Sequence, residues 1–299
     1  MNSNIITQSN ELIRNITIEN RNKEIISGAS RKSITLAAQE KKLILYLISK
    51  IKPNSKELET VSVTFSDFCD VMEIEKGGKQ FALIRQAVSQ LASVVFWIES
   101  DNKSYLCSWL NNENCIVDWE NKIIHLQLSN TLAPYLIDLK ENFTAYQLGF
   151  TIGFKGKYTY RLYEYLRSYL GLGHYLFPVE KFIQTITENK YQRITDLERR
   201  VIAKSVQEIN EYSDIYVTYQ KIFKKPGKRS RTTHFEFIIE EKAKEEKEKI
   251  MSKWNDVVSG ADAINAQTVN FIPTKKALKQ EEEWLQKYEE THKIQTIEE

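Results

Sequence analysis

The sequence predicts an α+β fold built from two units with the same order of helices and strands. Residues 193–231 have the pattern of a helix, a strand, a basic turn and a second strand. Residues 34–128 contain a similar succession, without evident residue identity to the second unit. With 299 residues, 41% of them apolar and 27% charged, the chain is long enough for two globular domains.

The first unit is expected to begin with a helix that Ser33 caps and Pro53 ends. Its expected elements are a helix at 34–51, a strand at 61–65, a short helix at 66–72 with Ser66 as cap, a turn at 75–79, a helix at 79–95, and strands at 104–110, 115–119 and 123–128. In the helix at 79–95, apolar residues recur every three or four positions, which predicts one buried stripe of Phe81, Ile84, Val88, Leu91 and Val95.

The second unit repeats this order. A connection at 139–154 leads to a helix at 157–170, a strand at 175–177, a short helix at 179–186, a longer helix at 194–210 and a closing hairpin. Helix, strand, helix, turn, helix and hairpin is the order of a winged-helix domain. We therefore expect two tandem winged-helix domains with a charged helical C-terminal extension. The expected boundaries are a flexible N-terminal arm at 1–30, domains at 31–138 and 139–240, and a charged tail of helix and linker at 241–299.

The hairpin that closes the second unit is strongly basic. Residues 215–219 and 233–238 alternate apolar and polar side chains, as half-buried antiparallel strands do. Pro226 and Gly227 suit a turn between them. Residues 221–231 hold six basic residues and no acidic one: Lys221, Lys224, Lys225, Lys228, Arg229 and Arg231. Such a patch attracts a polyanion.

The helix before this hairpin carries a polar stripe. At about 100° per residue, three side chains fall within about 40° of Arg193, namely Arg200, Lys204 and Gln207. Apolar residues gather on a different side. On a helix alone, such a stripe is usually a solvated surface. Beside a basic hairpin it favours DNA binding, with one helix face on a core and the other in a groove or against phosphates.

Composition limits the other possibilities. Residues 240–299 hold 10 basic and 14 acidic residues, a net charge of −4. Residues 1–239 hold 32 basic and 26 acidic residues, a net charge of +6, so the overall charge of +2 conceals a basic main part. Cys69, Cys107 and Cys115 are too few and too far apart for a disulfide framework or a zinc site. No apolar run has the length of a membrane span, and no secretory signal is visible. We expect a cytoplasmic protein without a membrane partner.

No catalytic motif is apparent. A rolling-circle nickase needs a tyrosine beside a metal site, commonly built on a His-x-His pair. The four histidines are isolated: His125, His174, His234 and His292. No G-x-x-x-x-G-K-[ST] phosphate loop occurs. We therefore expect no catalytic residue, no metal and no cofactor, and a nickase is the least favoured function. A nuclease whose catalytic residues lie far apart in the chain is an alternative that the absence of a local motif does not exclude.

A family resemblance extends from about residue 36 to residue 239. It rests on the ordered series 36–46, 128–136, 143–148, 158–166 and 197–210, with 214–217 after it. The match is most specific at 158–166, with the sequence Tyr-Thr-Tyr-Arg-Leu-Tyr-Glu-Tyr-Leu, and at 197–210 followed by 214–217. Together these segments resemble plasmid replication initiator proteins of the iteron-binding, twin winged-helix type. The tail after about residue 242 lies outside the resemblance.

The resemblance implies binding of double-stranded DNA by both units. Monomers of such initiators bind repeated origin sites (iterons), and dimers, formed through strands of the first domain, repress the initiator's own gene. Recruitment of the host replication initiator and helicase follows. A twin winged-helix transcriptional repressor without a replication role is the alternative, which the sequence hardly distinguishes.

The resemblance also locates the contacts. It places the second recognition helix from Arg193 onward, including Arg199, Arg200 and Lys204, with the wing at 221–231. The first recognition helix would begin near Lys79, with Gln80, Arg85, Gln86 and Gln90 as candidates. The first wing is expected around residues 101–103, which are weakly charged. The second domain should therefore supply most of the affinity.

Overall fold

The first unit has the element order of a winged helix. The computed structural model describes residues 5–17, 36–52, 54–72, 74, 77, 79–100, 103–224 and 231–253. The unit contains α2 (Ala38–Ser49), β3 (Val61–Thr64), α3 (Phe65–Met72), α4 (Gln80–Ala92), β6 (Ile116–Asp118) and β7 (Ile123–Leu126). Its antiparallel sheet has the strand order β3-β7-β6. Ile84, Val88 and Leu91 of α4 are buried, as expected, whereas Phe81 and Val95 are exposed, so their assignment to the buried stripe was wrong.

A second hairpin is inserted between α4 and the wing. It consists of β4 (Val95–Ser100) and β5 (Lys103–Ser108), and β4 also pairs with the short strand β2 (Ile16–Thr17). Because β6 and β7 complete the sheet with β3, the first wing is the β6–β7 hairpin. The prediction of the first wing around residues 101–103 was therefore wrong. Residues 94–98 are β-branched or aromatic, which favours a strand where we expected α4 to continue.

The N-terminal residues 5–17 belong to the folded core. β1 (Ile5–Ser9) pairs with β8 (Phe143–Gln147), and α1 (Asn10–Arg14) follows with the Ser9 side chain accepting a hydrogen bond from the Leu12 amide. Ile6 and Leu12 are fully buried. The expected flexible arm at 1–30 was wrong for these residues, because elements this short show no periodicity and their partner strand lies far along the chain. Residues 18–30 lie outside the described part.

α2 begins later than its sequence pattern suggested. Its first residue is Ala38, and the Glu40 side chain accepts a hydrogen bond from the Ala37 amide at 2.8 Å, as in half of a capping box. Ser33 and Pro53, which we expected to bound this helix, lie outside the described residues. The short helix α3 is capped by Thr64, whose Oγ1 accepts from the Asp67 amide, and not by Ser66.

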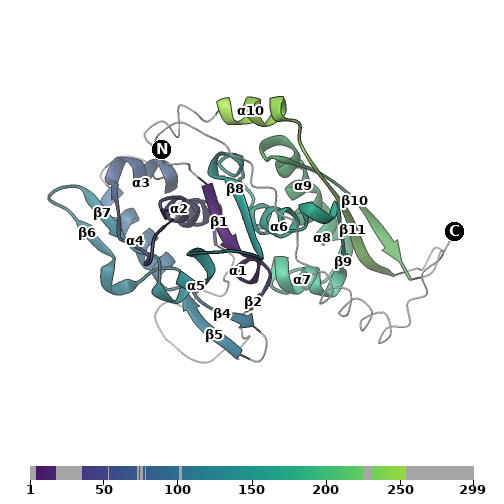
Figure 1. Ribbon diagram of the computed structural model, residues 1–299, viewed down its shortest axis with the longest axis horizontal. Coiled ribbons are helices and arrows are strands. Elements are labelled where there is room, and N and C mark those ends of the chain that lie inside the picture. Colours follow the sequence, from purple (N-terminus) through teal and green to yellow (C-terminus); the bar gives the residue numbers. More distant parts are fainter. Residues whose placement is uncertain are drawn as a thin grey trace.

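The second unit has the same order with longer strands. It contains α6 (Lys157–Arg167), β9 (His174–Pro178), α7 (Val179–Thr187), α8 (Ile194–Leu197), a π-helical turn (Glu198–Ile202), α9 (Ala203–Tyr212), β10 (Ile215–Phe223) and β11 (Thr232–Glu241). The sheet order is β10-β11-β9. Figure 1 shows α3, α4, β6 and β7 at one end of the molecule and β9, β10 and β11 at the other, with β1, β8, α2 and α6 between them.

A buried ionic contact anchors the second unit. Asp214, which is 3% exposed, accepts hydrogen bonds from the Tyr163 hydroxyl at 2.7 Å and from Arg167 Nε at 2.9 Å. Burial, together with the Asp214 charge, raises the pKa of Tyr163 well above its usual value, so the hydroxyl stays a donor. Asp214 directly precedes β10, and both donors lie on α6. The contact therefore fixes the start of the hairpin to the first helix of the unit.

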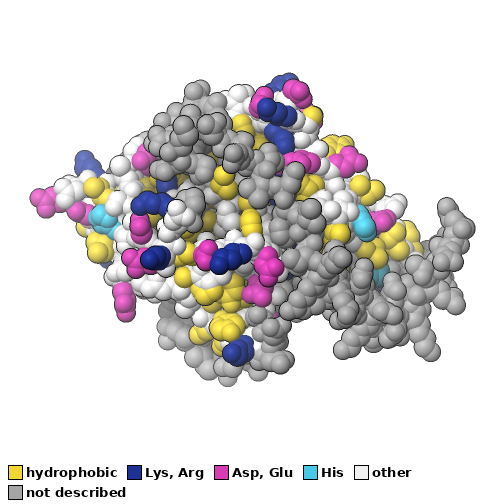
Figure 2. Space-filling model, viewed as in Figure 1, with side chains coloured by type: hydrophobic (Ala, Val, Ile, Leu, Met, Phe, Trp, Pro, Cys, Tyr) yellow, Lys and Arg dark blue, Asp and Glu magenta, His cyan; other side chains and the backbone are white. Residues whose placement is uncertain are grey.

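Two further helices, α5 and α10, complete the described fold. The short helix α5 (Ala133–Leu136) precedes β8, and α10 (Lys244–Ser252) follows β11. Lys247 of α10 pairs with Glu241 at 2.7 Å. Figure 2 shows α10 at the top of the view with basic and acidic side chains intermixed, which agrees with the charged helix expected at the start of the tail. No helix in the described part of the chain is long and apolar enough to cross a membrane.

Candidate nucleic-acid interface

The helix that runs from Ile194 to Tyr212 presents a basic face to solvent. Its buried side is apolar and consists of Leu197, Val201, Ile202, Val206 and Ile209. The predicted DNA-contacting residues are exposed at the other side or at the helix start: Arg193, Arg199, Arg200 and Lys204. An exposed cationic face above a buried apolar one is the arrangement that a recognition helix requires.

A π-helical turn interrupts this helix. It spans Glu198–Ile202 and contains Arg199 and Arg200. A π turn adds one residue to a helical turn, so a fixed 100° per residue does not hold across it. The predicted angular alignment of Arg200 with Lys204 therefore needs correction, although both side chains stay exposed. Such turns occur often at functional sites.

Acidic residues that the sequence interpretation missed lie beside the basic ones. Asp196 accepts from Arg199 at 3.3 Å and lies 3.6 Å from Arg200 Nε. Glu198 binds Lys221 of the hairpin at 2.9 Å. These pairs are exposed or half-exposed, so each is worth at most about 1 kcal/mol and can be exchanged for a phosphate. The spacing of Asp196 three and four residues before the arginines was visible in the sequence.

The second wing is long and basic at its described base. β10 and β11 pair in register from Ile215 to Ile222, with an irregularity at Ile222/Phe223. Lys221 and Lys224 are exposed on β10 and just after it. Arg231 is exposed before β11 and lies 3.6 Å from Glu180 of α7. Lys225, Lys228, Arg229 and the predicted Pro226-Gly227 turn lie outside the described residues, so their placement stays a prediction.

Two side-chain contacts hold α9 on this hairpin. Asn210 pairs with the backbone of Val217, accepting from its amide at 2.7 Å and donating to its carbonyl at 2.9 Å. Lys242 donates from Nζ to the carbonyls of Asn210 and Ser213 at the end of the helix. Burial lowers the pKa of Lys242. These bonds fix the orientation of the basic helix relative to the wing.

The first unit presents a weaker polar face. Lys79 immediately precedes α4, and Arg85, Gln86 and Gln90 are exposed along it. Gln80 is different, because its Nε2 donates to the Cys69 Sγ on α3 at 3.1 Å. Its side chain therefore packs the two helices together, although we predicted that it contacts DNA.

The first wing is aromatic and acidic. Trp119 at its turn packs edge-to-face on Phe81 of α4 and on Phe65 of α3, with ring centroids 5.2 and 5.5 Å apart. Asp118 and Glu120 lie in the same hairpin. Hydrogen bonds from Asn121, and from the Glu120 amide, lower the pKa of Asp118, so this carboxylate stays charged. The exposed Lys122 at the same turn offsets one of the two carboxylates, so the wing has a net charge of −1 and lacks the excess of positive charge of the second wing. Aromatic contacts fix this wing to α4.

The described residues include no group of three or more His, Cys, Asp and Glu side chains that could hold a metal ion. What the molecule does present is two winged helices in one chain, each with an exposed polar helix, and one with a basic wing. This arrangement defines a tandem winged-helix protein of the kind that binds nucleic acid.

Family comparisons specify this class further. Residues 5–167 match the family described as "Initiator Replication protein, WH1", and residues 179–239 match "Initiator Rep protein, WH2". The chain therefore belongs to the initiator replication protein family. The first match extends past the expected boundary at residue 138 and includes β8 and α6.

Single proteins share only a low sequence identity with this chain. A curated "Replication initiation protein" of Escherichia coli is 24% identical over 198 residues, which cover 62% of this chain and 61% of the relative. A Pi initiator protein, solved in complex with iteron DNA, has a TM-score of 0.56 at 16% identity, and the match covers 81% of this chain and all of that chain. This likeness supports the fold. RctB domains 2–3, at a TM-score of 0.40 and 12% identity over 78% of this chain and 97% of theirs, are too dissimilar to argue from.

Proposed function

We propose that this protein initiates plasmid replication by binding repeated origin sites in double-stranded DNA with both winged-helix units. The observation that carries the proposal is the pair of exposed polar helices, α4 and the Ile194–Tyr212 helix, in one chain whose family is that of replication initiators. The iteron DNA bound by the Pi initiator protein, which shares the fold, supports the same class of site.

The two elements of the second unit have different tasks in this proposal. Lys221, Lys224 and Arg231 of the wing contact phosphates and release counterions. Arg199 and Arg200 release their ion pairs with Asp196 when DNA binds. They then contact phosphates, or base edges in the major groove. Because both units belong to one chain, the first unit adds affinity through effective concentration when its helix reaches an adjacent groove.

A footprint of the full chain on its origin DNA tests this proposal. We expect protection across two consecutive grooves of each repeat, with the half assigned to α4 lost in an Arg85→Ala/Gln86→Ala double variant. Protection confined to the width of one module would contradict binding by both units. A plasmid that carries only this gene and its upstream DNA should replicate, whereas repression of the gene without replication would favour the repressor alternative.

We also propose that dimers form through the inserted hairpin and repress the protein's own gene. Among the described strands, β5 is at the edge of the sheet order β2-β4-β5 and pairs only with β4. Its Tyr105 and Leu106 are 44% and 54% exposed, and Val95 of β4 is 49% exposed. A Leu106→Lys variant should sediment as a monomer at concentrations where the natural chain dimerises. An unchanged sedimentation coefficient would place the dimer contact elsewhere.

The chemistry proposed is binding without cleavage of DNA. We propose that the protein acts in the cytoplasm, where the plasmid is, and that it recruits the host replication initiator and helicase after binding. Incubation with supercoiled origin DNA and Mg²⁺ should yield neither a nick nor a covalent tyrosine–DNA adduct. Either product would replace the proposal with a nickase.

A further inference from the structure

An aromatic cluster lies between α4 and the first wing. Phe81, in the first turn of α4, is 48% exposed, and Trp119 of the wing turn is 40% exposed. Their rings meet edge to face with centroids 5.2 Å apart, and Phe65 of α3 packs on Phe81 at 5.9 Å. A side chain that two neighbouring rings hold in place has little conformational freedom to lose on binding. Phe81 therefore presents an apolar surface to solvent in a fixed position.

The exposed side chains at the start of α4 are apolar. The helix begins with Gln80, Phe81, Ala82 and Leu83, and the last three of these are exposed. Gln80 is half-buried, and its Nε2 donates to Cys69 Sγ on α3 at 3.1 Å. The three exposed side chains can pack against an apolar group but cannot form a hydrogen bond with a base edge.

We propose that Phe81 contacts the 5-methyl group of a thymine in the major groove and so sets the base preferred at one position of the repeat. The inference rests on the proposed binding of DNA by α4. Residues near the start of a recognition helix are the ones that reach base edges. The thymine methyl is the apolar group that distinguishes a base pair in the major groove, and phenylalanine is among the side chains that contact it. Arg85, four residues further along, is exposed on the same side of the helix, so Phe81 borders the polar face of α4.

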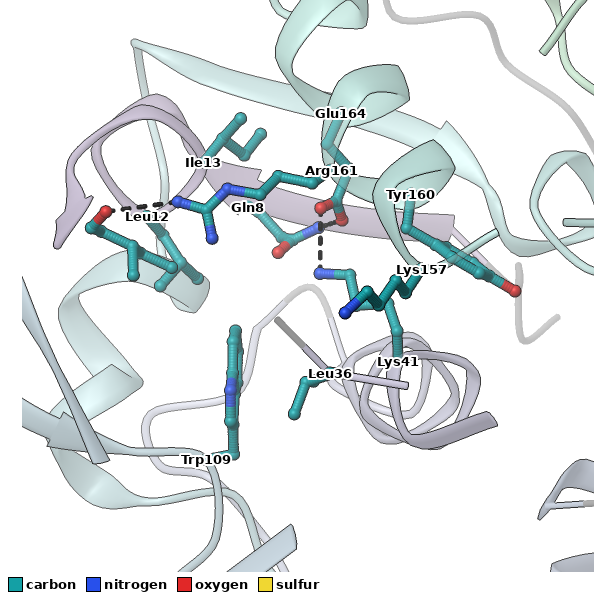
Figure 3. Close-up of a pocket in the computed structure, with 11 residues that line it drawn as sticks. Gln8, Leu12, Ile13, Leu36, Lys41, Trp109, Lys157, Tyr160, Arg161 and Glu164 are labelled. Carbon is teal, nitrogen blue, oxygen red and sulfur yellow. Dashed lines mark hydrogen bonds and ion pairs between the residues drawn. The ribbon is translucent and has the colours of Figure 1, made fainter. Parts of the chain in front are cut away.

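Phe81 is separate from the contact that joins α2 of the first unit to α6 of the second. Figure 3 shows Lys41 of α2 beside Glu164 of α6, with which it pairs at 2.9 Å. Gln8 of β1 donates to the same carboxylate at 2.8 Å. The described residues that line the cavity in Figure 3 include none from α4. A substitution at Phe81 therefore alters the surface of the first unit and leaves this contact between the units intact.

Uracil lacks only the 5-methyl group of thymine, so uracil-substituted DNA tests the contact. The probes are a duplex with one repeat from the DNA upstream of the gene, and a series of duplexes in which one thymine of that repeat is replaced by deoxyuridine. The full chain should bind about fourfold more weakly when the thymine that Phe81 contacts is replaced, which corresponds to about 0.8 kcal/mol for one buried methyl group. Phe81→Ala should bind both duplexes equally. Phe81→Leu keeps an apolar side chain and should retain part of the preference for thymine.

Leu83→Ala is the matched control. Leu83 is 39% exposed, about 160° around the helix from Phe81, and its loss should leave the preference for thymine unchanged. Each variant is compared with itself on two duplexes, so a general loss of affinity or of folded protein cancels from the ratio.

Three results would overturn the inference. The first is binding that is insensitive to uracil at every thymine of the repeat. The second is an undiminished preference for thymine in Phe81→Ala, which would assign the methyl contact to a neighbour such as Ala82. The third is a preference lost equally in Leu83→Ala, which would make it a property of how α4 is positioned. Failure of the chain to bind the repeat at all would instead contradict the proposed function on which the inference rests.

Discussion

The two winged-helix units differ most in what surrounds their recognition helices. In the first unit, the wing is fixed to α4 by Trp119 and Phe81 and carries Asp118 and Glu120. In the second unit, the wing is cationic and an ionic contact connects it to its helix, through Lys221 and Glu198. Aromatic contacts hold a wing in one position, whereas an exposed ion pair is weak and can be replaced by a phosphate.

This difference separates two tasks that the same fold can perform. The second unit is suited to hold the DNA backbone, because its basic side chains can leave their ion pairs with Asp and Glu and bind DNA phosphates instead. The first unit is suited to position its helix rigidly and to avoid phosphates near its acidic wing. Most of the salt dependence of DNA binding should therefore come from the second unit, and the following substitutions test that division.

The largest effect is expected from Asp214→Ala in the second unit. This change leaves the Arg167 charge and the Tyr163 hydroxyl buried without their acceptor. It should lower the free energy of unfolding by about 3–5 kcal/mol. Urea unfolding measures this, with Asp196→Ala as a control at a half-exposed ion pair, which should cost at most about 1 kcal/mol. Equal losses in both variants would mean that Asp214 is not an anchor.

A smaller effect is expected from Arg200→Ala. If Arg200 reads a base, specific binding should weaken by about 1–3 kcal/mol while non-specific binding changes little. Titration of origin and scrambled DNA at one salt concentration separates the two. Arg85→Ala on α4 is the matched change in the first unit and should cost less. A larger loss from Arg85→Ala would reverse the assignment of the main affinity to the second unit.

The helix faces could be predicted from the sequence, whereas the pairings between distant segments could not. The spacing of Ile84, Val88 and Leu91 was enough to identify the buried side of α4, because local periodicity reflects burial. The first wing was misplaced because only the pairing of β7 with β3 reveals which hairpin completes the sheet. Likewise, β1 becomes recognisable as a strand only beside β8, which is far along the chain.

The sequence also predicted only part of the candidate nucleic-acid interface. The exposure of Arg200 and Lys204 followed from the polar stripe, but the π turn that contains Arg200 did not, since no local pattern in the sequence marks it. Nothing in the sequence indicated that the Gln80 side chain donates a hydrogen bond to Cys69 of the neighbouring helix, and its predicted DNA contact stays a prediction. Contacts between helices depend on how the helices pack, and a single helical wheel does not contain that information.

Lys224→Ala should weaken binding to all sequences alike. Lys224 is exposed where β10 ends, and one lost phosphate contact reduces the slope of log K against log salt by about 0.9. Binding titrations over a range of salt concentrations measure this slope, with Lys244→Ala on α10 as a control of equal charge that should leave it unchanged. We expect the same result for Lys225. A loss confined to origin DNA would make Lys224 a base-reading residue.

The smallest effect, and the most direct test of the comparison, is expected from Glu120→Lys in the first wing. If this wing lies near DNA and its acidity keeps it from phosphates, a lysine there should add one contact. The salt slope should then steepen by up to about 0.9, with tighter binding to every sequence. Glu113→Lys makes the same charge change at an exposed site outside the wing hairpin and should leave the slope close to that of the natural chain. A slope that Glu120→Lys leaves unchanged would mean that the first wing stays away from DNA, so that the rigid contact between Trp119 and Phe81 serves to shape α4 alone.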